Sequence, residues 1–308
     1  MYMKKQIALL LLLGLSLFAG AQQLPHWSQY MLNDYAMNPA IAGKNPYFLG
    51  MSDNRYQWSG ITDAPRTYIL TVHGPLKKMN MGVGSQLFVD ITGPTRRIGF
   101  YGSYAYHAKL TDKIKLGLGL NAGILQFVMD GQKITLHDAG DYVLQNALQS
   151  ALMPDFGAGF YLYSDNFWVG ASSMQIFESR IKFFDYMATT GVINRHYYGM
   201  AGYRFHLGED FILEPSVLTK YVKPAPFQFD AGMRAIYKEK IWFGASFRNR
   251  DAWDMYTGFI YRENLMIGYS YDFTTTNLKN YSSGTHELLI GIRFNNRSTA
   301  SASESKFN

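Results

Sequence analysis

The chain has 308 residues, a formal net charge of +6 and no cysteine. The lack of cysteine excludes disulfides, cysteine-ligated metal sites and lipid attachment through a cysteine. The lysines and arginines are not clustered as they are in nucleic-acid-binding segments, so the composition indicates no nucleic acid partner.

Residues 1–21 have the pattern of a secretory signal peptide. Lys4 and Lys5 precede an apolar run that ends at Ala19-Gly20-Ala21, an A-x-A cleavage site. The run is too short to cross a membrane as a helix, and no later segment approaches the ~18 unbroken apolar residues that a spanning helix needs. A membrane protein with this sequence is therefore expected to cross the bilayer with strands.

Residues 22–45 lack the two-residue alternation of a strand. Pro25, Pro39 and Gly43 interrupt any long element, although residues 28–37 could hold a short helix with Ser28 as its cap. We predict a separate N-terminal segment that lies on the periplasmic side or is inserted into the lumen of the fold that follows.

The clearest pattern in the chain is a hairpin at residues 96–130, with its turn at Thr111-Asp112-Lys113. Apolar side chains occupy the even positions of both limbs, and small or polar side chains occupy the odd positions. Strict period two indicates strands. Each limb is longer than the ~5–6 residues usual in soluble sheets and matches the ~9–11 residues that cross a bilayer. The apolar face would contact lipid, and the glycine-rich face would line a lumen.

The same alternation recurs along residues 46–294 and predicts about 14 strands, an even number as in bacterial single-chain barrels. The predicted strands are 47–58, 66–73, 80–91, 96–110, 114–129, 155–163, 167–177, 196–207, 211–222, 227–238, 241–249, 254–262, 265–273 and 284–294. We therefore predict an all-β fold, a transmembrane antiparallel β-barrel. The alternative is a secreted β-sandwich, which does not need strands of this length.

The connections predict how the barrel is oriented. Tight turns follow alternate strands, whereas residues 130–154 and 178–195 form long connections, the first of which could be helical at 142–152. Barrels have short periplasmic turns and longer extracellular loops, so we predict that both termini are periplasmic in the outer membrane of a Gram-negative bacterium. The last strand ends on the aromatic Phe294. The polar tail at 295–308 is predicted to be disordered.

Charged side chains occupy predicted lumen positions and have both signs on neighbouring strands. The candidate lumen charges are Glu214, Lys220, Asp230, Arg234, Arg248, Asp272, Glu287 and Arg293. They could line a wet porin interior. They could also form bidentate carboxylate–guanidinium pairs that stiffen and partly block the lumen. Strand alternation does not choose between these two interpretations.

The sequence shows no catalytic, cofactor-binding or metal-binding motif. No predicted strand pair presents a serine and a histidine as a hydrolase needs, and His107, His196 and His206 are interpreted as polar lumen groups. We therefore predict that the protein is not an enzyme and needs no cofactor.

The first third of the mature chain carries a series of motifs directly after the signal peptide. They are Trp27-Ser28-Gln29-Tyr30-Met31, Asn38-Pro39-Ala40-Ile41-Ala42-Gly43, Arg55-Tyr56-Gln57-Trp58-Ser59-Gly60-Ile61 and Ala64-Pro65-Arg66-Thr67. This order of motifs resembles the opening of the PorP/SprF family of Bacteroidetes. One departure is Ile41, where the family usually has an aromatic residue. The candidate partner-binding or family-motif residues are Trp27, Tyr30, Asn38, Pro39, Gly43, Arg55, Trp58 and Gly60. Their roles could equally be structural, in a turn or as interface anchors.

The resemblance implies a non-enzymatic outer-membrane component of the type IX secretion system, tied in some bacteria to gliding motility. Such a protein would be a scaffold or anchor for the secretion machinery or for secreted surface adhesins. Its implied partners are the periplasmic ring and trans-envelope motor proteins, a secreted adhesin, or both. Two alternatives remain open at this stage, a passive channel for small solutes and, less favoured, an outer-membrane hydrolase.

Overall fold

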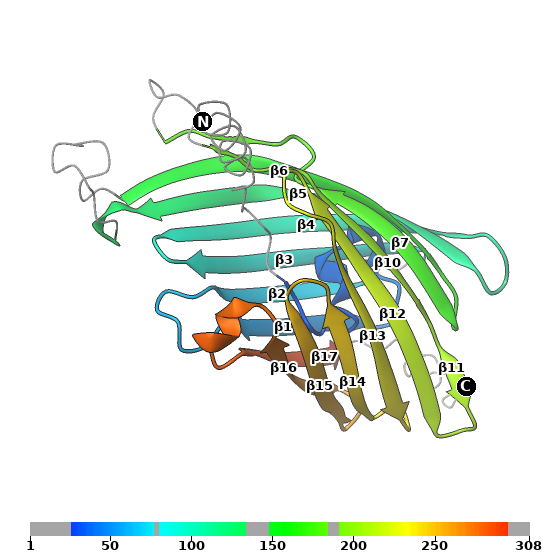
Figure 1. Ribbon diagram of the computed structural model, residues 1–308. Helices are drawn as coiled ribbons and strands as arrows, with labels where there is room; N and C mark the ends of the chain where they lie inside the picture. The colour runs from blue at the N-terminus through cyan, green and yellow to red at the C-terminus, as the bar shows by residue number, and fades with distance from the viewer. Residues whose placement is uncertain (1–25, 77–79, 134–147, 184–190, 295–308) are drawn as a thin grey trace, which may run out of the picture.

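The computed structural model describes residues 26–76, 80–133, 148–183 and 191–294 (Figure 1). The predicted signal peptide and the polar tail lie outside these residues, as does most of the segment with predicted helix at 142–152. None of the helices among the described residues is long and apolar enough to cross a membrane.

The described chain forms a closed antiparallel β-barrel of 14 strands, as predicted (Figure 1). The barrel strands are β1 (Phe48–Tyr56), β2 (Arg66–Pro75), β3 (Met81–Thr92), β4 (Thr95–Lys109), β5 (Lys115–Asp130), β6 (Leu148–Tyr163), β7 (Phe167–Met174), β10 (His196–Tyr203), β11 (Phe205–Leu207), β12 (Phe211–Val222), β13 (Gln228–Tyr237), β14 (Ile241–Arg248), β15 (Ala252–Tyr261), β16 (Leu265–Thr274) and β17 (Thr285–Phe294). Strands β10 and β11 are two parts of one barrel strand, which is interrupted at Arg204, and both pair with β12. The pairing of β1 with β17 closes the ring.

The two faces of the barrel wall differ as the alternation predicts. On β5 the outward Leu118, Leu120 and Ile124 are exposed, whereas the inward Leu125 is buried. On β17 the outward Ile290 is likewise exposed. Large apolar side chains thus cover the outside of the barrel, the surface that contacts lipid in a transmembrane barrel.

The barrel has two unlike ends. At the short-turn end lie the connections 110–114, 164–166, 208–210, 238–240 and 262–264, and there Phe48 of β1 pairs with Phe294 of β17. At the long-loop end lie the connections 57–65, 131–147, 175–195 and 275–284. The last of these contains the 3-10 helix η5 (Asn277–Asn280). Connections 93–94 and 249–251 at this end are also short, so loop length alternates only approximately.

One predicted boundary is wrong. Residues 148–154 were expected in an irregular or helical connection, but β6 begins at Leu148, which pairs with Asp130 of β5. Gln149, Ala151 and Met153 point inward, and the positions between them point outward. The alternation therefore continues through Pro154. Proline has no backbone N–H to donate to the neighbouring strand, but its presence does not end β6.

The second long connection contains strands as well. It contains a small two-stranded sheet of β8 (Arg180–Ile181) and β9 (Gly191–Val192). Ile181 and Ile193 are buried in the main apolar core, and the ring of Phe183 lies 6.1 Å from that of Phe127 on β5. This connection therefore packs against the inner side of the tall β5–β6 wall.

Candidate functional site

Residues 26–43, here called the luminal segment, lie inside the barrel (Figure 1). The segment is built of turns and two 3-10 helices, η2 (Asp34–Ala36) and η3 (Pro39–Ile41), in place of the predicted helix. Ser28 caps no helix, because its hydroxyl donates to Asp272 on β16 instead, at 2.7 Å. The cap is Asn38, whose side-chain oxygen accepts from the amide of Ala40 at 3.0 Å. A proline at the first helical position suits this cap.

The segment runs the length of the lumen. His26 lines a small cavity with Lys220 and Asp230, near the long-loop end. At the short-turn end, His107 Nε2 lies 2.8 Å from the carbonyl oxygen of Ala42, and β1 begins soon after. The even strand count places Phe48 and Phe294 at one end of the barrel, whereas the first described residue lies toward the other. The count alone therefore does not fix the side from which the chain enters.

Burial and charge act together on His26. Burial lowers the pKa of His26 well below its usual range, and the positive charges of Lys220, Arg248 and Arg55 act in the same direction.

One side of the segment packs against an apolar, glycine-lined wall. A Cβ added to Gly82 would lie 1.9 Å from the carbonyl oxygen of Ala42, and one added to Gly119 would lie 2.3 Å from the amide nitrogen of Ala40. Glycine at these lumen positions lets two backbones approach closely. The luminal segment thus packs against the glycine-rich face that was inferred from the sequence.

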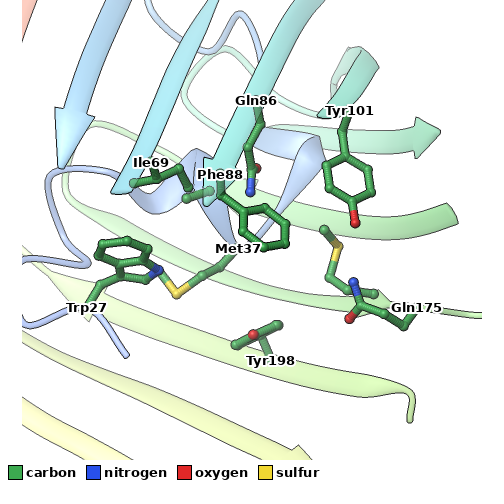
Figure 2. Close-up of a pocket in the computed structure, with 10 residues that line it drawn as sticks. Trp27, Met37, Ile69, Gln86, Phe88, Tyr101, Gln175 and Tyr198 are labelled. Atoms are coloured by element: carbon green, nitrogen blue, oxygen red, sulfur yellow. The ribbon is translucent and has the colours of Figure 1, made fainter. Parts of the chain in front are cut away.

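A small cavity remains on this apolar side (Figure 2). It has a volume of about 40 Å³ and lies between Trp27 and Met37 of the segment and Phe88, Tyr101 and Tyr198 of the wall. A water molecule needs ~10–15 Å³ by this measure, so the cavity has room for a few waters but not for a solute the size of a sugar.

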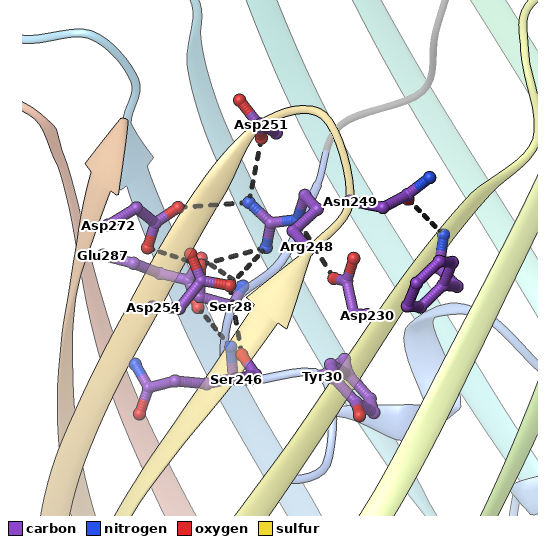
Figure 3. A network of polar contacts seen from close by, with 12 residues as sticks. Ser28, Tyr30, Asp230, Ser246, Arg248, Asn249, Asp251, Asp254, Asp272 and Glu287 are labelled. Carbon is purple, nitrogen blue, oxygen red and sulfur yellow. Dashed lines mark hydrogen bonds and ion pairs between the residues drawn. The ribbon is translucent and has the colours of Figure 1, made fainter. Parts of the chain in front are cut away.

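The other side of the segment is held by a charge network centred on Arg55 and Arg248, and Figure 3 shows the part of it around Arg248. Arg55 on β1 contacts Asp272 at 2.6 Å and Glu287 at 3.0 Å, and donates to the Ser28 hydroxyl at 2.8 Å. Glu287 also accepts from the backbone amides of Ser28 and Gln29, each at 2.9 Å. Strands β1, β16 and β17 thereby hold the first turn of the luminal segment.

Arg248 on β14 completes the network. Its guanidinium lies 3.0 Å from Asp230, 3.1 Å from Asp254 and 3.2 Å from Asp272. It also contacts Asp251 at 3.2 Å and donates to the Ser28 hydroxyl at 3.2 Å. Ser28 and Asp272 are therefore partners of both guanidinium groups, and such charge-assisted contacts are the stronger kind of hydrogen bond.

The network has more carboxylates than guanidinium groups. Asp53 is fully buried on β1, and neither of its oxygens has a hydrogen-bond partner among the described residues. Asp53, Asp251 and Asp254 were missing from the sequence prediction. The alternation of β1 and β15 could have identified Asp53 and Asp254, because both lie at inward positions of their strands. Asp251 lies in a connection between strands, where no alternation indicates which way a side chain points.

The remaining predicted lumen charges lie at several places. Glu214 contacts Arg204 at 2.7 Å and Arg234 at 2.5 Å, in a second buried cluster. Lys220 is buried near His26. Arg293 is half-buried at the short-turn end, where its guanidinium lies 5.1 Å from the ring centre of Tyr47.

The candidate partner-binding residues divide into two groups. Trp27, Tyr30, Asn38, Pro39, Gly43 and Arg55 are all buried inside the barrel. The Tyr30 hydroxyl lies 2.9 Å from that of Ser216, and the Asn38 amide donates to the Phe160 carbonyl at 2.9 Å. Trp58 and Gly60 lie outside the lumen, in the connection between β1 and β2, where both have positive φ. Ser59, between them, exchanges backbone hydrogen bonds with the β16–β17 connection.

The histidines interpreted as lumen groups have separate partners. His107 Nδ1 lies 3.0 Å from the Tyr163 hydroxyl, and His196 Nδ1 lies 2.8 Å from the Asn194 carbonyl. His206 on β11 pairs with Ile212 of β12, a position on the inward face, and is exposed near the short-turn end. Within the described ranges, no cluster of three or more histidine, aspartate and glutamate side chains could hold a metal ion.

Solved outer-membrane barrels share this fold. The Ralstonia pickettii toluene transporter TbuX is 10% identical over 87% of this chain and 93% of its own, with a TM-score of 0.50. The CymD monoaromatic hydrocarbon channel is 11% identical over 88% of this chain and 92% of its own, with a TM-score of 0.48. At such identities the likeness concerns the fold alone.

The sequence itself gives one match. A family model described as type IX secretion system membrane protein PorP/SprF matches residues 19–292. No curated protein is significantly similar to the chain in sequence.

Proposed function

Because the chain belongs to the PorP/SprF family of type IX secretion system membrane proteins, we propose that it is a non-enzymatic scaffold or anchor of that system in the outer membrane. The observation that carries this proposal is the occupied lumen. A passive channel needs a continuous aqueous path, whereas here residues 27–43 are buried, apart from the half-buried Met31, Leu32 and Asp34, and contact strands around the ring. A stiff, filled cylinder is suited to holding other proteins in place.

The open space at the short-turn end supports the same proposal. A hollow of about 750 Å³ opens there beside Tyr47, Arg262 and Arg293. Tyr47 and Ile260 line this hollow and also pack against a second apolar cluster, in which Met31 and Leu32 of the segment pack with Met51, Trp242 and Tyr256. We infer that this cluster closes the hollow on the side of the lumen.

We place the short-turn end in the periplasm and the long-loop end outside the cell, because barrels of this kind have longer external loops. In this orientation Phe294 faces the periplasm. The periplasmic ring and motor proteins would meet the short-turn end, and a secreted adhesin would meet the long-loop end. The burial of Trp27, Tyr30, Asn38 and Pro39 supports a structural role for these motif residues, in which they hold the barrel that presents the partner surfaces.

Isolation of the protein from native outer membranes in mild detergent tests the proposal. Other components of the secretion system, a secreted adhesin, or both should co-purify with the full chain, and the pure protein should give no steady conductance in planar bilayers. A porin-sized conductance with no co-purified protein would favour the passive channel. Lipid turnover abolished by a serine substitution would instead establish the hydrolase.

A further inference from the structure

Two arginines stand in one row on the outer wall of the barrel, at its long-loop end. Arg66 is the first residue of β2, and Arg96 is the second residue of β4. Both pair with Ile91 of β3, which lies between them. With strands spaced about 4.8 Å apart, the backbones of the two arginines are about 10 Å apart.

Both side chains point away from the lumen. Their neighbours in sequence, Thr67 and Arg97, point inward, where the Thr67 hydroxyl donates to Asp90 at 2.7 Å and Arg97 forms an ion pair with the same carboxylate. Since successive side chains of a strand face opposite sides, Arg66 and Arg96 face outward, and both are exposed.

Among the described residues, neither guanidinium has a carboxylate partner. Neither forms an ion pair within the described residues, and the outward positions of β2, β3 and β4 hold no aspartate or glutamate. Asp63, the one carboxylate of the β1–β2 connection, makes no ion pair with either. By contrast, Lys109 at the short-turn end is paired with Asp112.

The surroundings of the two arginines are apolar on one side and polar on the other. Toward the middle of the barrel the outward positions hold Leu70 on β2 and Phe100 on β4, 49% and 53% exposed. At the level of the two arginines, Tyr56 of β1 is paired with Arg66. The Tyr68 hydroxyl donates a hydrogen bond to the Tyr56 hydroxyl at 3.3 Å. The arginines therefore stand where the hydrocarbon-facing band ends and the headgroup layer begins, a level at which aromatic girdles are found.

We propose that Arg66, Arg96, Tyr56 and Tyr68 form a binding site for the phosphate group of a membrane lipid in the leaflet at the long-loop end. Guanidinium groups bind phosphate oxygens through paired hydrogen bonds, and the tyrosine hydroxyls supply further donors. The apolar strips below them accept the acyl chains of the same molecule. A free phosphate ion would use only the polar part of this surface. The inference requires only that the barrel spans the outer membrane.

Native mass spectrometry of the detergent-purified full chain tests the assignment. The wild-type protein should retain a phosphate-bearing lipid, and the double variant Arg66→Gln with Arg96→Gln should retain far less. A hydrogen bond to a charged group contributes about 1.5–3 kcal/mol, so each arginine lost should weaken retention about tenfold or more. The matched control is Arg262→Gln, which removes an exposed arginine at the short-turn end and should leave retention unchanged.

Three outcomes would overturn the assignment. Equal lipid retention by the double variant would show that the arginines do not bind lipid. Binding of inorganic phosphate by wild type, with no phosphate-bearing lipid retained, would show a site for the ion alone. Loss of a co-purified protein, with lipid unchanged, would assign the patch to a protein partner. Heat-modifiable migration of the double variant on gels confirms that its barrel has folded.

Discussion

Replacement of Arg55 by methionine tests whether the charge network holds the luminal segment. The side chains of Arg55, Asp272 and Glu287 are at most 2% exposed. Methionine keeps much of the length of arginine but removes the charge, so Glu287 loses its one ion-pair partner and Asp272 retains only Arg248. The Ser28 hydroxyl also loses one of its two guanidinium donors.

The expected cost follows from this burial. Removal of one member of a buried ion pair costs about 3–5 kcal/mol, because the remaining charge is left unpaired in a medium of low dielectric constant. The comparison variant is Lys109→Met, whose ion pair with Asp112 is exposed at the barrel rim. Such surface pairs contribute about 1 kcal/mol or less.

Urea unfolding in detergent micelles, followed by tryptophan fluorescence, gives the free energy of unfolding of each variant. Addition of Asp272→Asn to Arg55→Met should recover about 1 kcal/mol or more, because it removes one of the carboxylates left without Arg55. If Arg55→Met cost no more than Lys109→Met, the network would not be what holds the lumen together, and the reasoning would be refuted.

Three further tests concern lumen residues Gly119, Asn38 and Asp53. Gly119→Ala should lower the free energy of unfolding by about 1–3 kcal/mol in the same urea assay, because the added Cβ would overlap Ala40. The control is Gly102→Ala on the outer face. A Cβ there would have no atom within 4 Å, so this variant should be nearly neutral. Asn38→Ala should cost about 1–3 kcal/mol through loss of the cap and of the bond to Phe160. Asn38→Asp keeps the capping acceptor but places a buried carboxylate oxygen against the Phe160 carbonyl, so it should cost at least as much. Asp53→Asn should leave the urea midpoint unchanged or raise it, because it neutralises a buried carboxylate without hydrogen bonds; a clear fall would show that the charge of Asp53 is needed.

The fold could be predicted in detail because a barrel wall is governed by local rules. The alternation in β4 and β5 reports directly which face meets lipid, and tight turns such as 208–210 mark the strand ends. The prediction failed at Leu148, where Pro154 concealed a continuing strand. In that case pairing with β5 over its full length outweighs the local signal of one proline.

The interior could be predicted only in part. Alternation identified Arg248, Asp272 and Glu287 as lumen residues, but it could not show that Ser28 is their shared partner. That contact joins residues more than two hundred positions apart and depends on the path of a segment with no periodicity of its own. The same limit applies to Gly82 and Gly119, whose role is visible only once Ala40 and Ala42 are seen against them.

The position of Ser28 has a consequence for biogenesis. Arg55 on the first strand and Glu287 on the last both form hydrogen bonds with this residue. The closing pair of strands is therefore also linked through the luminal segment. We therefore expect the barrel wall to form around residues 26–43, with the pairing of β1 and β17 completed last.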